Sequence, residues 1–375
     1  MSATMPIADL KAGRPECGQE GAQANQTKPL VSVVVPAYNE ADILQENLEL
    51  LCNYLASIED EYDWEVVVVN DGSTDETGQL AEDFAIAHRN VHVLHHPKNF
   101  GIGQAFQYAF SHCAGDFVVV LDVDLSYSPD HVGQLLTKIR KTKAKVVTAS
   151  PYMEGGHVTN VPPMRKALSI WANRFLAAVA KGHLTTLTGM VRVYDGPFLR
   201  TLTLKSMGME VNPEIIYKAK LLQAQIEEVP AHLDWRHTKN PVGTRRRSSM
   251  KLVQHTRAVV ASGFIFRPFI LFTLPGFLLL MFSSYVNAWM VIHFLAQYSR
   301  LSEYSWFLDR ASNAVAAAYQ QFPHTFIVGL LSLILSIQLI GLGVMSYQSK
   351  RYFEEIFYLC THIYKGQRKE PYYRG

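Results

Sequence analysis

The stretch Phe117-Val-Val-Val-Leu-Asp122-Val-Asp124 decides the fold of this chain. Its apolar residues, mostly β-branched or aromatic, are typical of a strand buried on both faces, as in a parallel sheet between layers of helices. Two carboxylates follow at i and i+2, and side chains two apart in an extended chain point the same way. Because ligands of open α/β sheets bind beyond the carboxyl ends of the strands, Asp122 and Asp124 are candidate ligands of Mg²⁺ or Mn²⁺. The plainer alternative is a solvated turn before a helix that Asp130 caps.

The composition differs between the two parts of the chain. The 375 residues carry a formal charge of +2, which gives no indication of nucleic-acid binding. Up to about residue 260 the sequence is typical of a soluble domain, and the remainder is far more apolar. The four cysteines are far apart, without metal-binding spacing or a disulfide framework, which favours a reducing compartment. Residues 1–29 lack an apolar run, so we expect a disordered tail rather than a secretory signal.

Strand-like and helix-like patterns alternate from Val31 onward. Strands are predicted at residues 31–35, 65–69, 91–94, 117–121 and 145–148, and helices at residues 41–58, 75–88, 101–113 and 130–141. Such alternation is typical of βαβ units and a mainly parallel sheet, so we expect an α/β domain over residues 30–240. Right-handed crossovers then bring the loops after the strands to one edge of the sheet.

Four polar loops follow the predicted strands, and each alone has an ordinary explanation as a turn or a helix cap. They read Pro36-Ala-Tyr-Asn-Glu40, Asn70-Asp-Gly-Ser-Thr-Asp75, Lys98-Asn-Phe-Gly101 and Asp122-Val-Asp124. A basic residue, amide donors and a helix N-terminus at one sheet edge suit an anionic ligand. Together and in this order, the loops resemble those of the inverting family-two glycosyltransferases of GT-A fold, which use nucleotide-sugar donors. The resemblance covers roughly residues 31–236.

This resemblance implies roles for individual residues. It implies donor-binding residues around the nucleobase, ribose and diphosphate of a UDP- or GDP-sugar, namely Pro36, Tyr38, Glu40, Asp71, Lys98 and Asp122. Asp122 and Asp124 would hold the metal on the diphosphate and so act in catalysis. The chemistry agrees, because a departing nucleoside diphosphate builds up negative charge that a divalent cation stabilises as a Lewis acid.

A polar stripe is predicted on the helix that begins near Met164. Arg165, Ser169 and Asn173 stand at i, i+4 and i+8, so they share one face, which could simply be solvated. The stripe resembles that of the polyprenyl-phosphate glycosyltransferases, the subgroup that includes dolichyl-phosphate mannose synthases. The resemblance implies that Arg165 and Ser169 hold the acceptor phosphate, and that Arg165 is catalytic.

Three positions depart from the pattern of that subgroup. The chain has Ser150-Pro151-Tyr152 where the subgroup often has Ser-Arg-Tyr, which removes one cation from the acceptor phosphate. It has Ser126 where a Gln often follows the two carboxylates, and Thr185 where an Asp is expected. These departures leave the predicted donor site intact and concern the acceptor.

Two membrane spans are predicted at residues 268–295 and 326–347. Asp, Glu, Lys and Arg are absent between Arg267 and Arg300 and between Arg310 and Lys350, and about 20 helical residues cross the hydrocarbon core. Basic residues concentrate outside this hairpin, in the juxtamembrane segment 241–267 and the C-terminal segment 350–375. The positive-inside rule therefore predicts that the catalytic domain and both termini are cytosolic. We expect residues 243–261 to lie along the membrane as an amphipathic helix, and residues 352–364 are a candidate for a second surface helix.

The sequence thus predicts a membrane-anchored, metal-dependent, inverting glycosyltransferase that moves one sugar to a polyprenyl phosphate. A phosphate acceptor is largely a dianion at neutral pH and needs little help from a base, whereas a hydroxyl acceptor needs a positioned carboxylate, for which Glu214 is a weak candidate. The alternatives are a glycolipid synthase acting on a lipid hydroxyl and a non-catalytic scaffold that binds nucleotide sugars. A processive polysaccharide synthase is disfavoured, because a Gln-x-x-Arg-Trp motif and additional spans are absent. The sequence is compatible with a homo-oligomer.

Overall fold

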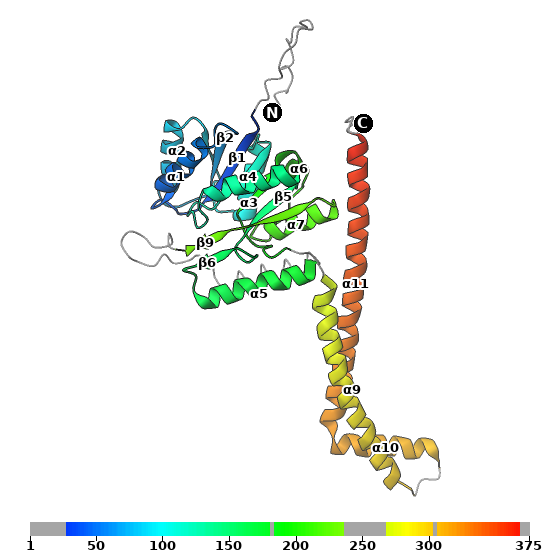
Figure 1. The fold of residues 1–375 in the computed structure, drawn as a ribbon. Helices are drawn as coiled ribbons and strands as arrows, with labels where there is room; N and C mark the ends of the chain where they lie inside the picture. Colours follow the sequence, from blue (N-terminus) through cyan, green and yellow to red (C-terminus); the bar gives the residue numbers. More distant parts are fainter. Residues whose placement is uncertain (1–27, 181–183, 236–267, 303–305, 368–375) are drawn as a thin grey trace, which may run out of the picture.

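The structure is a computed structural model, and it describes residues 28–180, 184–235, 268–302 and 306–367, without the side chains of residues 175–180 and 361–367. A seven-stranded sheet has the order β3-β2-β1-β4-β7-β5-β8 (Figure 1). Its strands are β1 (Leu30–Ala37), β2 (Asp63–Asn70), β3 (Val91–His95), β4 (Phe117–Val120), β5 (Val146–Ser150), β7 (Arg192–Asp195) and β8 (Ile226–Pro230). Neighbouring strands are parallel except where antiparallel β7 lies between β4 and β5. The predicted α/β fold with a mainly parallel sheet is confirmed.

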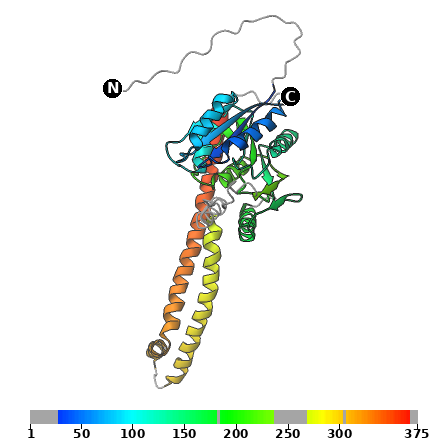
Figure 2. The same cartoon turned by 90° about the vertical axis from the view of Figure 1, so that its left-hand side faces the viewer.

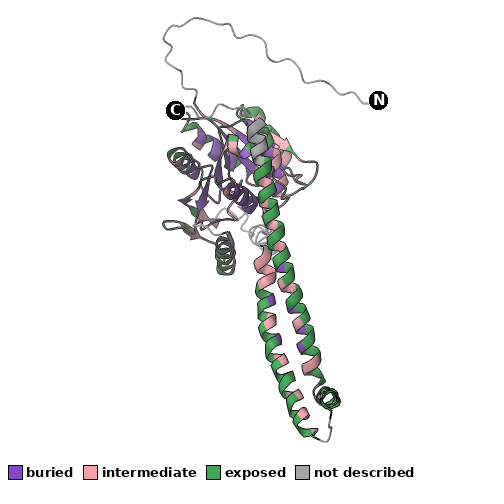
Figure 3. Ribbon diagram, turned by 90° about the vertical axis from the view of Figure 1, so that its right-hand side faces the viewer, coloured by how far each residue is buried: buried purple, intermediate pink, exposed green. Residues whose placement is uncertain are grey.

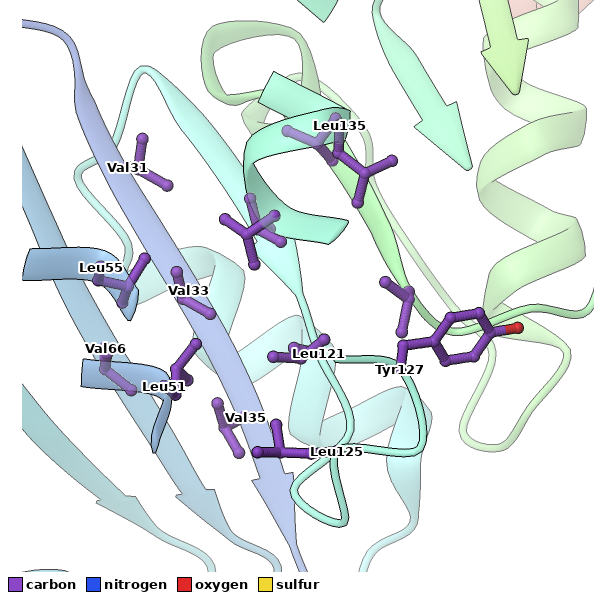
Figure 4. Close-up of a cluster of buried hydrophobic side chains, with 14 of the residues drawn as sticks. Val31, Val33, Val35, Leu51, Leu55, Val66, Leu121, Leu125, Tyr127 and Leu135 are labelled. Carbon is purple, nitrogen blue, oxygen red and sulfur yellow. The ribbon is translucent and has the colours of Figure 1, made fainter. Parts of the chain in front are cut away.

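Helices cover both faces of this sheet. The first five are α1 (Leu44–Ala56), α2 (Thr77–Ala87), α3 (Ile102–His112), α4 (Asp130–Thr142) and α5 (Pro163–Ala180), and α6 (Gly196–Arg200) and α7 (Val211–Leu221) follow. Alternate residues of one strand enter opposite cores: Val33 packs in the core beneath α1, α2 and α4, and Val34 packs in the core beneath α3 and α7. Figure 4 shows the first core, in which Leu51 and Leu55 lie beside Val33. Burial on both faces explains why β1 and β4 consist almost wholly of apolar residues.

The carboxyl ends of the two central strands differ slightly from the prediction. β1 continues through Pro36 to Ala37, and Val34 is its last residue paired with β4. The backbone nitrogen of Pro36 faces the side where β4 has already ended, so the missing N–H interrupts no ladder. β4 itself ends at Val120, where it pairs with Arg192 of β7, so Asp122 and Asp124 follow the strand instead of extending it.

A hairpin of two long helices leaves one end of the α/β domain (Figures 1 and 2). α9 (Pro268–Arg300) and α11 (Pro323–Gln367) pack side by side, and α10 (Phe307–Gln321) connects them. Both long helices are apolar and long enough to cross a membrane. Most of their residues face outward (Figure 3), which is unlike the core helices of a soluble protein.

A polar contact joins the middle of α9 to the second turn of α11. The side-chain amide of Asn287 and the hydroxyl of Ser283 both donate to the backbone oxygen of Gly329, at 3.0 and 3.1 Å. The absence of a Cβ at Gly329 allows this approach, because a Cβ there would come within 3.0 Å of the Asn287 side chain. Small residues and interhelical hydrogen bonds of this kind hold helix pairs together in a lipid environment.

The candidate surface helix at residues 352–364 is helical, but it is a continuation of α11 and no separate element. α11 runs past the apolar segment and along the α/β domain (Figure 1), where it meets α7. The Tyr217 hydroxyl donates to a carboxylate oxygen of Glu354 at 3.4 Å, and the Lys350 ammonium lies 5.6 Å from the Tyr217 ring centre. Phe357 packs on the core beneath α7. Burial, together with the Glu354 carboxylate, raises the pKa of Tyr217.

If Phe357 anchors α11 on α7, then Phe357→Ala should destabilise the α/β domain by about 1–2 kcal/mol, less than the roughly 3–5 kcal/mol of a fully buried phenylalanine. Thermal unfolding in detergent measures this loss. Ile356, 60% exposed on the same helix, supplies the control Ile356→Ala, which should leave the unfolding temperature unchanged. Equal effects of the two substitutions would contradict the docking of α11 on this domain.

Candidate active site

Asp122 and Asp124 occupy a tight turn at the carboxyl end of β4. The backbone N–H of Leu125 donates to the Asp122 carbonyl at 3.1 Å, and Leu125 has a φ of +46°. The N–H of Ser126 donates to a carboxylate oxygen of Asp124 at 3.0 Å, which orients that side chain. We had expected an extended chain to direct the two carboxylates toward one point. The extended chain was wrong, because a turn sets the direction of both side chains.

The turn is tied to the surrounding helices and strands. The Asn47 amide of α1 donates to the Val123 carbonyl at 2.9 Å, and the N–H of Leu121 donates to the Val34 carbonyl at 3.0 Å. Asn47 is buried, so this side chain holds the turn from the face of the sheet that α1 covers. The carboxylate turn is thus held by Asn47 from the helix predicted at residues 41–58 and by a backbone hydrogen bond between the two predicted strands.

The electrostatics of this pair suit a cation. Burial raises the pKa of Asp122 well above its usual range, and the nearby Asp124 carboxylate raises it further. Two like charges in a half-buried turn are relieved by a cation that both can bind. Within the described residues, no group of three or more His, Cys, Asp or Glu side chains could hold a metal ion. Two carboxylates complemented by ligand oxygens are a donor set that Mg²⁺ or Mn²⁺ accepts, so the residues present fit such a metal.

The loops after β1 and β2 interlock beside this turn. Asn39, with a φ of +55°, accepts a hydrogen bond from the Thr74 N–H at 2.8 Å, and its own N–H donates to the Ser73 hydroxyl. The N–H of Glu40 donates to the Thr77 hydroxyl at 2.8 Å. With the two loops hydrogen-bonded in this way, the Tyr38 ring is 40% exposed at the sheet edge, where it could stack on a planar ligand group.

Asp71 has more structural contacts than the sequence indicated. Its carboxylate accepts hydrogen bonds from the His96 ring at 2.7 Å, the Phe100 N–H at 3.0 Å and the Gly101 N–H at 2.9 Å. The side chain is buried, so both oxygens serve to hold the loop after β3. That loop carries Lys98, whose ammonium lies 5.3 Å from the centre of the Phe100 ring. Asp71 therefore shapes the predicted donor pocket through its neighbours.

Gly72 lets the loops after β2 and β3 touch. Its φ is +67°, and a Cβ at this position would lie 2.1 Å from the carbonyl carbon of Lys98. A left-handed backbone and a close backbone approach both require glycine. The Asn-Asp-Gly-Ser turn is therefore a packing surface for the Lys98 loop as well as a turn.

The polar stripe of α5 faces the domain, which excludes a purely solvated stripe. Ser169 accepts a hydrogen bond from the Tyr152 hydroxyl at 2.7 Å. Asn173 is buried, and its side-chain oxygen accepts from the N–H groups of Leu187 and Thr188 at 2.8 and 3.2 Å. The Arg165 guanidinium lies 4.3 Å from the centre of the Trp235 ring, and partial burial lowers its pKa.

Thr185 stands where an Asp is expected, and it contacts a carboxylate that comes from β8. Glu228 of β8 accepts from the Thr185 N–H and hydroxyl at 2.8 and 3.0 Å and from the Thr186 N–H at 2.8 Å. Ser150, which precedes the departure at Pro151, bonds the Thr185 and Thr186 hydroxyls at 2.6 Å each. An Asp at residue 185 would lie against Glu228, so threonine suits this neighbour.

Two ionic residues near the site, half-buried Glu228 and fully buried Arg192, were given no role by the sequence analysis. Arg192 of β7 is fully buried and donates to the carbonyl oxygens of Leu187 and Asn212, at 2.5 and 3.2 Å. Arg192 thereby connects the start of α7 with the loop at Leu187, and Asn173 also bonds to this loop. A charged residue beginning a short strand gives no periodic signal, so the burial of Arg192 could not be predicted from the pattern.

Glu214, the candidate base for a hydroxyl acceptor, is engaged in structural contacts. Its carboxylate accepts from the Lys218 ammonium at 2.5 Å and from the backbone N–H groups of Lys205 and Ser206 at 3.0 and 2.8 Å. Burial alone would raise the pKa of Glu214, but these hydrogen bonds outweigh it and lower the pKa. A strongly bonded carboxylate with a lowered pKa is a poor general base.

A cavity of about 390 Å³ adjoins the carboxylate turn. Leu125 and Ser126 line one side, and the two-stranded sheet of β6 (His157–Thr159) and β9 (His232–Asp234) lines another. His131 of α4 is fixed in the wall, since its Nε2 accepts from the His232 N–H at 3.1 Å and its Nδ1 donates to the Ser128 carbonyl at 2.9 Å. This hollow lies between the carboxylate turn and the strand that precedes Trp235.

Known proteins agree with this arrangement. A family model described as glycosyl transferase family 2 matches residues 32–202. A protein of Micrococcus luteus named undecaprenyl-phosphate mannosyltransferase is 32% identical over 207 residues, which cover 53% of this chain and 82% of the relative. The chain belongs to glycosyl transferase family 2. As a member of this family, it is an enzyme that transfers a sugar from a nucleotide-sugar donor.

Two further similarities accompany this membership in family 2. A protein of Trichomonas vaginalis named dolichyl-phosphate beta-glucosyltransferase is 29% identical over 245 residues, which cover 62% of this chain and 71% of the relative. A solved structure of glucosyl-3-phosphoglycerate synthase from Mycobacterium tuberculosis shares 20% identity with a TM-score of 0.46, covering 63% of this chain and 77% of that one. The family 2 enzyme described here therefore has relatives whose names include two different polyprenyl phosphates.

Asp71→Asn should lower both stability and donor affinity. An amide presents a donor to at least one of the N–H groups of Phe100 and Gly101, so the change should cost about 1–3 kcal/mol. Displacement of the Lys98 loop should weaken binding of a nucleoside diphosphate by about tenfold. Calorimetric titration and thermal unfolding measure the two effects. Asp83→Asn, at an exposed position of α2, is the control and should change neither quantity.

Proposed function

We propose that this enzyme is a membrane-anchored, metal-dependent, inverting glycosyltransferase that uses a polyprenyl phosphate, dolichyl or undecaprenyl, as acceptor at the cytosolic face of a membrane. The observation that carries the proposal is the division of α5 into two faces. Arg165 and Ser169 are on the face toward the domain, and Met164 and Trp171 are 77% and 52% exposed on the other. An acceptor with a charged head and an apolar tail matches this division.

The location of α5 supports a lipid acceptor. α5 lies at the end of the α/β domain from which the hairpin extends (Figure 1). The same helix also carries the exposed cations Lys166 and Arg174, which suit the negatively charged surface of a cytosolic leaflet. A polyprenyl phosphate could therefore reach Arg165 from the bilayer without leaving it completely. The names of the relatives from Micrococcus and Trichomonas favour the same class of acceptor.

A phosphate acceptor needs little proton transfer. Its second pKa is near about 6, so at neutral pH a phosphate oxygen can attack the anomeric carbon without a general base. The engagement of Glu214 with Lys218 and two backbone N–H groups disfavours the alternative of a lipid hydroxyl acceptor, which requires such a base. Arg165 would hold the phosphate, and the Tyr152–Ser169 hydrogen bond would place the Ser169 hydroxyl beside it. The basic run at residues 245–247, a further candidate for sharing the phosphate charge, lies outside the described residues.

The donor would bind across the loops after β1, β2, β3 and β4. In this proposal Pro36, Tyr38, Glu40 and Asp71 form the nucleoside side of the pocket, and Lys98 lies toward the phosphates. Asp122 and Asp124 would hold a divalent metal, which neutralises the charge that develops on the departing diphosphate. Direct displacement inverts the configuration at the anomeric carbon, because attack and departure occur on opposite faces of the sugar. The intact carboxylate pair disfavours the alternative of a non-catalytic scaffold.

The orientation of the membrane hairpin follows from charge. The segments outside it carry most of the basic residues, at positions 245–267 and 350–369, whereas the connection between the helices has Arg300 and Arg310 offset by Glu303 and Asp309. By the positive-inside rule the α/β domain and both termini would be cytosolic. That side also supplies nucleotide sugars to a site at the membrane surface.

Asp124→Asn should abolish transfer and leave the fold intact, because Asp124 lies in a turn outside the apolar cores. The loss of a charged metal ligand should reduce the turnover rate by at least about a hundredfold, on the scale of removing a group that stabilises transition-state charge. Transfer of a labelled sugar and the unfolding temperature are the two measurements. A chelator should reproduce the loss in the unaltered enzyme, and full activity in excess chelator would overturn the metal-dependent mechanism.

Arg165→Ala should reduce acceptor efficiency by roughly ten- to a hundredfold, because a charge-assisted hydrogen bond contributes about 1.5–3 kcal/mol. Donor affinity should stay unchanged, since Arg165 belongs to the acceptor side of the site. Arg174→Ala, on the outward face of the same helix, is the matched control and should cost much less in detergent. The decisive comparison uses one donor with polyprenyl phosphate and with the corresponding polyprenol. Equal transfer to the alcohol would favour the glycolipid-synthase alternative.

A further inference from the structure

The connection between the two long helices contains a helix that the sequence pattern did not reveal. α10 extends from Phe307 to Gln321 and crosses the far end of the hairpin (Figure 1), where Figure 2 shows it almost end-on. Asp309 and Arg310 are its charged residues. The helix therefore lies across the axis of the two candidate membrane spans, at the end most distant from the α/β domain.

α10 is fixed to the hairpin by contacts at both of its ends. The Arg310 guanidinium donates to the Tyr298 carbonyl at 3.0 Å and lies 4.2 Å from the centre of the Tyr298 ring. At the other end, Gln297 donates to the Gln321 side chain at 2.6 Å, and the His293 and Phe322 rings stack at 3.8 Å. Ala314 and Ala318 are fully buried against the hairpin. These contacts fix which faces of α10 point outward.

Two different faces of α10 remain exposed. Leu308, Val315 and Tyr319 are 59%, 45% and 45% exposed, and their spacing of i, i+7 and i+11 places them on one side of the helix. The polar side chains of Asp309, Asn313 and Gln320 lie about a third of a turn away and are also exposed. Trp306 and Phe307, exposed at 64% and 67%, add large aromatic side chains at the start of the helix.

The apolar face points back along the hairpin. The Tyr319 ring meets Phe326, near the start of α11, edge to face at 5.7 Å. From Phe326, α11 continues through the apolar segment toward the α/β domain. The face that carries Leu308, Val315 and Tyr319 is thus continuous with the outward-facing apolar surface of the membrane helices, and the polar face is not.

We infer that α10 lies in the interface of the leaflet opposite the catalytic domain, with Leu308, Val315 and Tyr319 among the acyl chains and Asp309, Asn313 and Gln320 in water. The inference rests on the proposed membrane-spanning hairpin and adds a lipid-binding surface on the far side of the membrane. A helix with separate apolar and polar faces binds at the boundary between headgroups and acyl chains. The exposed Trp306 and Tyr319 are residues that anchor segments at this depth.

Quenching of a fluorescent label tests the depth of each face. The full-length enzyme receives Cys17→Ser and Cys360→Ser, while Cys52 and Cys113 remain, because both are buried and burial raises the pKa of their thiols to about 11 and 12. Single cysteines are then introduced as Val315→Cys and Leu308→Cys on the apolar face and Asn313→Cys on the polar face. Each is labelled with an environment-sensitive dye and reconstituted in vesicles of neutral phospholipid.

Lipids that carry a nitroxide near the headgroup should quench the labels at residues 308 and 315 at least about threefold more than the label at residue 313, and aqueous iodide should show the reverse order. Similar quenching on both faces would overturn the inference. Protection of residues 308 and 315 from both quenchers, with release on dilution of the protein, would instead show a second copy of the chain on this face and would also overturn it.

A label at an exposed position near the middle of the apolar segment of α11, introduced as Ile334→Cys, separates this inference from the proposed topology. Quenching of that label by lipids with a nitroxide deep in the acyl chain establishes the spanning hairpin, so failure on α10 then concerns α10 alone. Absence of deep quenching at residue 334 would contradict the membrane-spanning hairpin itself, and with it the inference.

Discussion

The parallel pairing of β1 with β4 is the constraint on which the site depends. This pairing, with β2 and β3 beyond it, brings the carboxyl ends of four strands to the same edge of the sheet. Helices bury both faces, so the backbone groups of these strands must bond within the sheet, and the register has little freedom. The polar loops that follow these four strands therefore lie together at that edge. The loops of the proposed donor pocket and the carboxylate turn follow from this geometry.

Much of the α/β domain could be predicted because its signals are local. The apolar run before Asp122 and the helical spacing from Leu44 to Leu55 each report burial by neighbours that any α/β sheet supplies. The turn that holds Asp122 and Asp124 could not be derived in the same way. Its geometry depends on where β7 stops pairing with β4, and β7 lies about 70 residues further along the chain.

Other features depended on contacts between distant segments. Asp71 has the composition of a turn residue, and its three hydrogen bonds to the loop after β3 become visible when that loop is folded beside it. Glu228 accepts hydrogen bonds from Thr185 and Thr186 across more than 40 residues. α10 was missed for another reason, since the sequence analysis considered the connection between the two spans for its charge alone. Local patterns cannot report partners of this kind.

The unbroken course of α11 connects bilayer thickness to the site. This helix has 45 residues and is about 68 Å long at 1.5 Å per residue, so its apolar segment and its contact with α7 belong to one rod. Insertion of one residue between them would advance the contact by about 1.5 Å and rotate it by about 100°, turning Glu354 away from Tyr217. A thicker or thinner membrane tilts such a rod. If the hairpin spans a membrane as proposed, the lipid environment would thereby change the height of the α/β domain above the membrane surface.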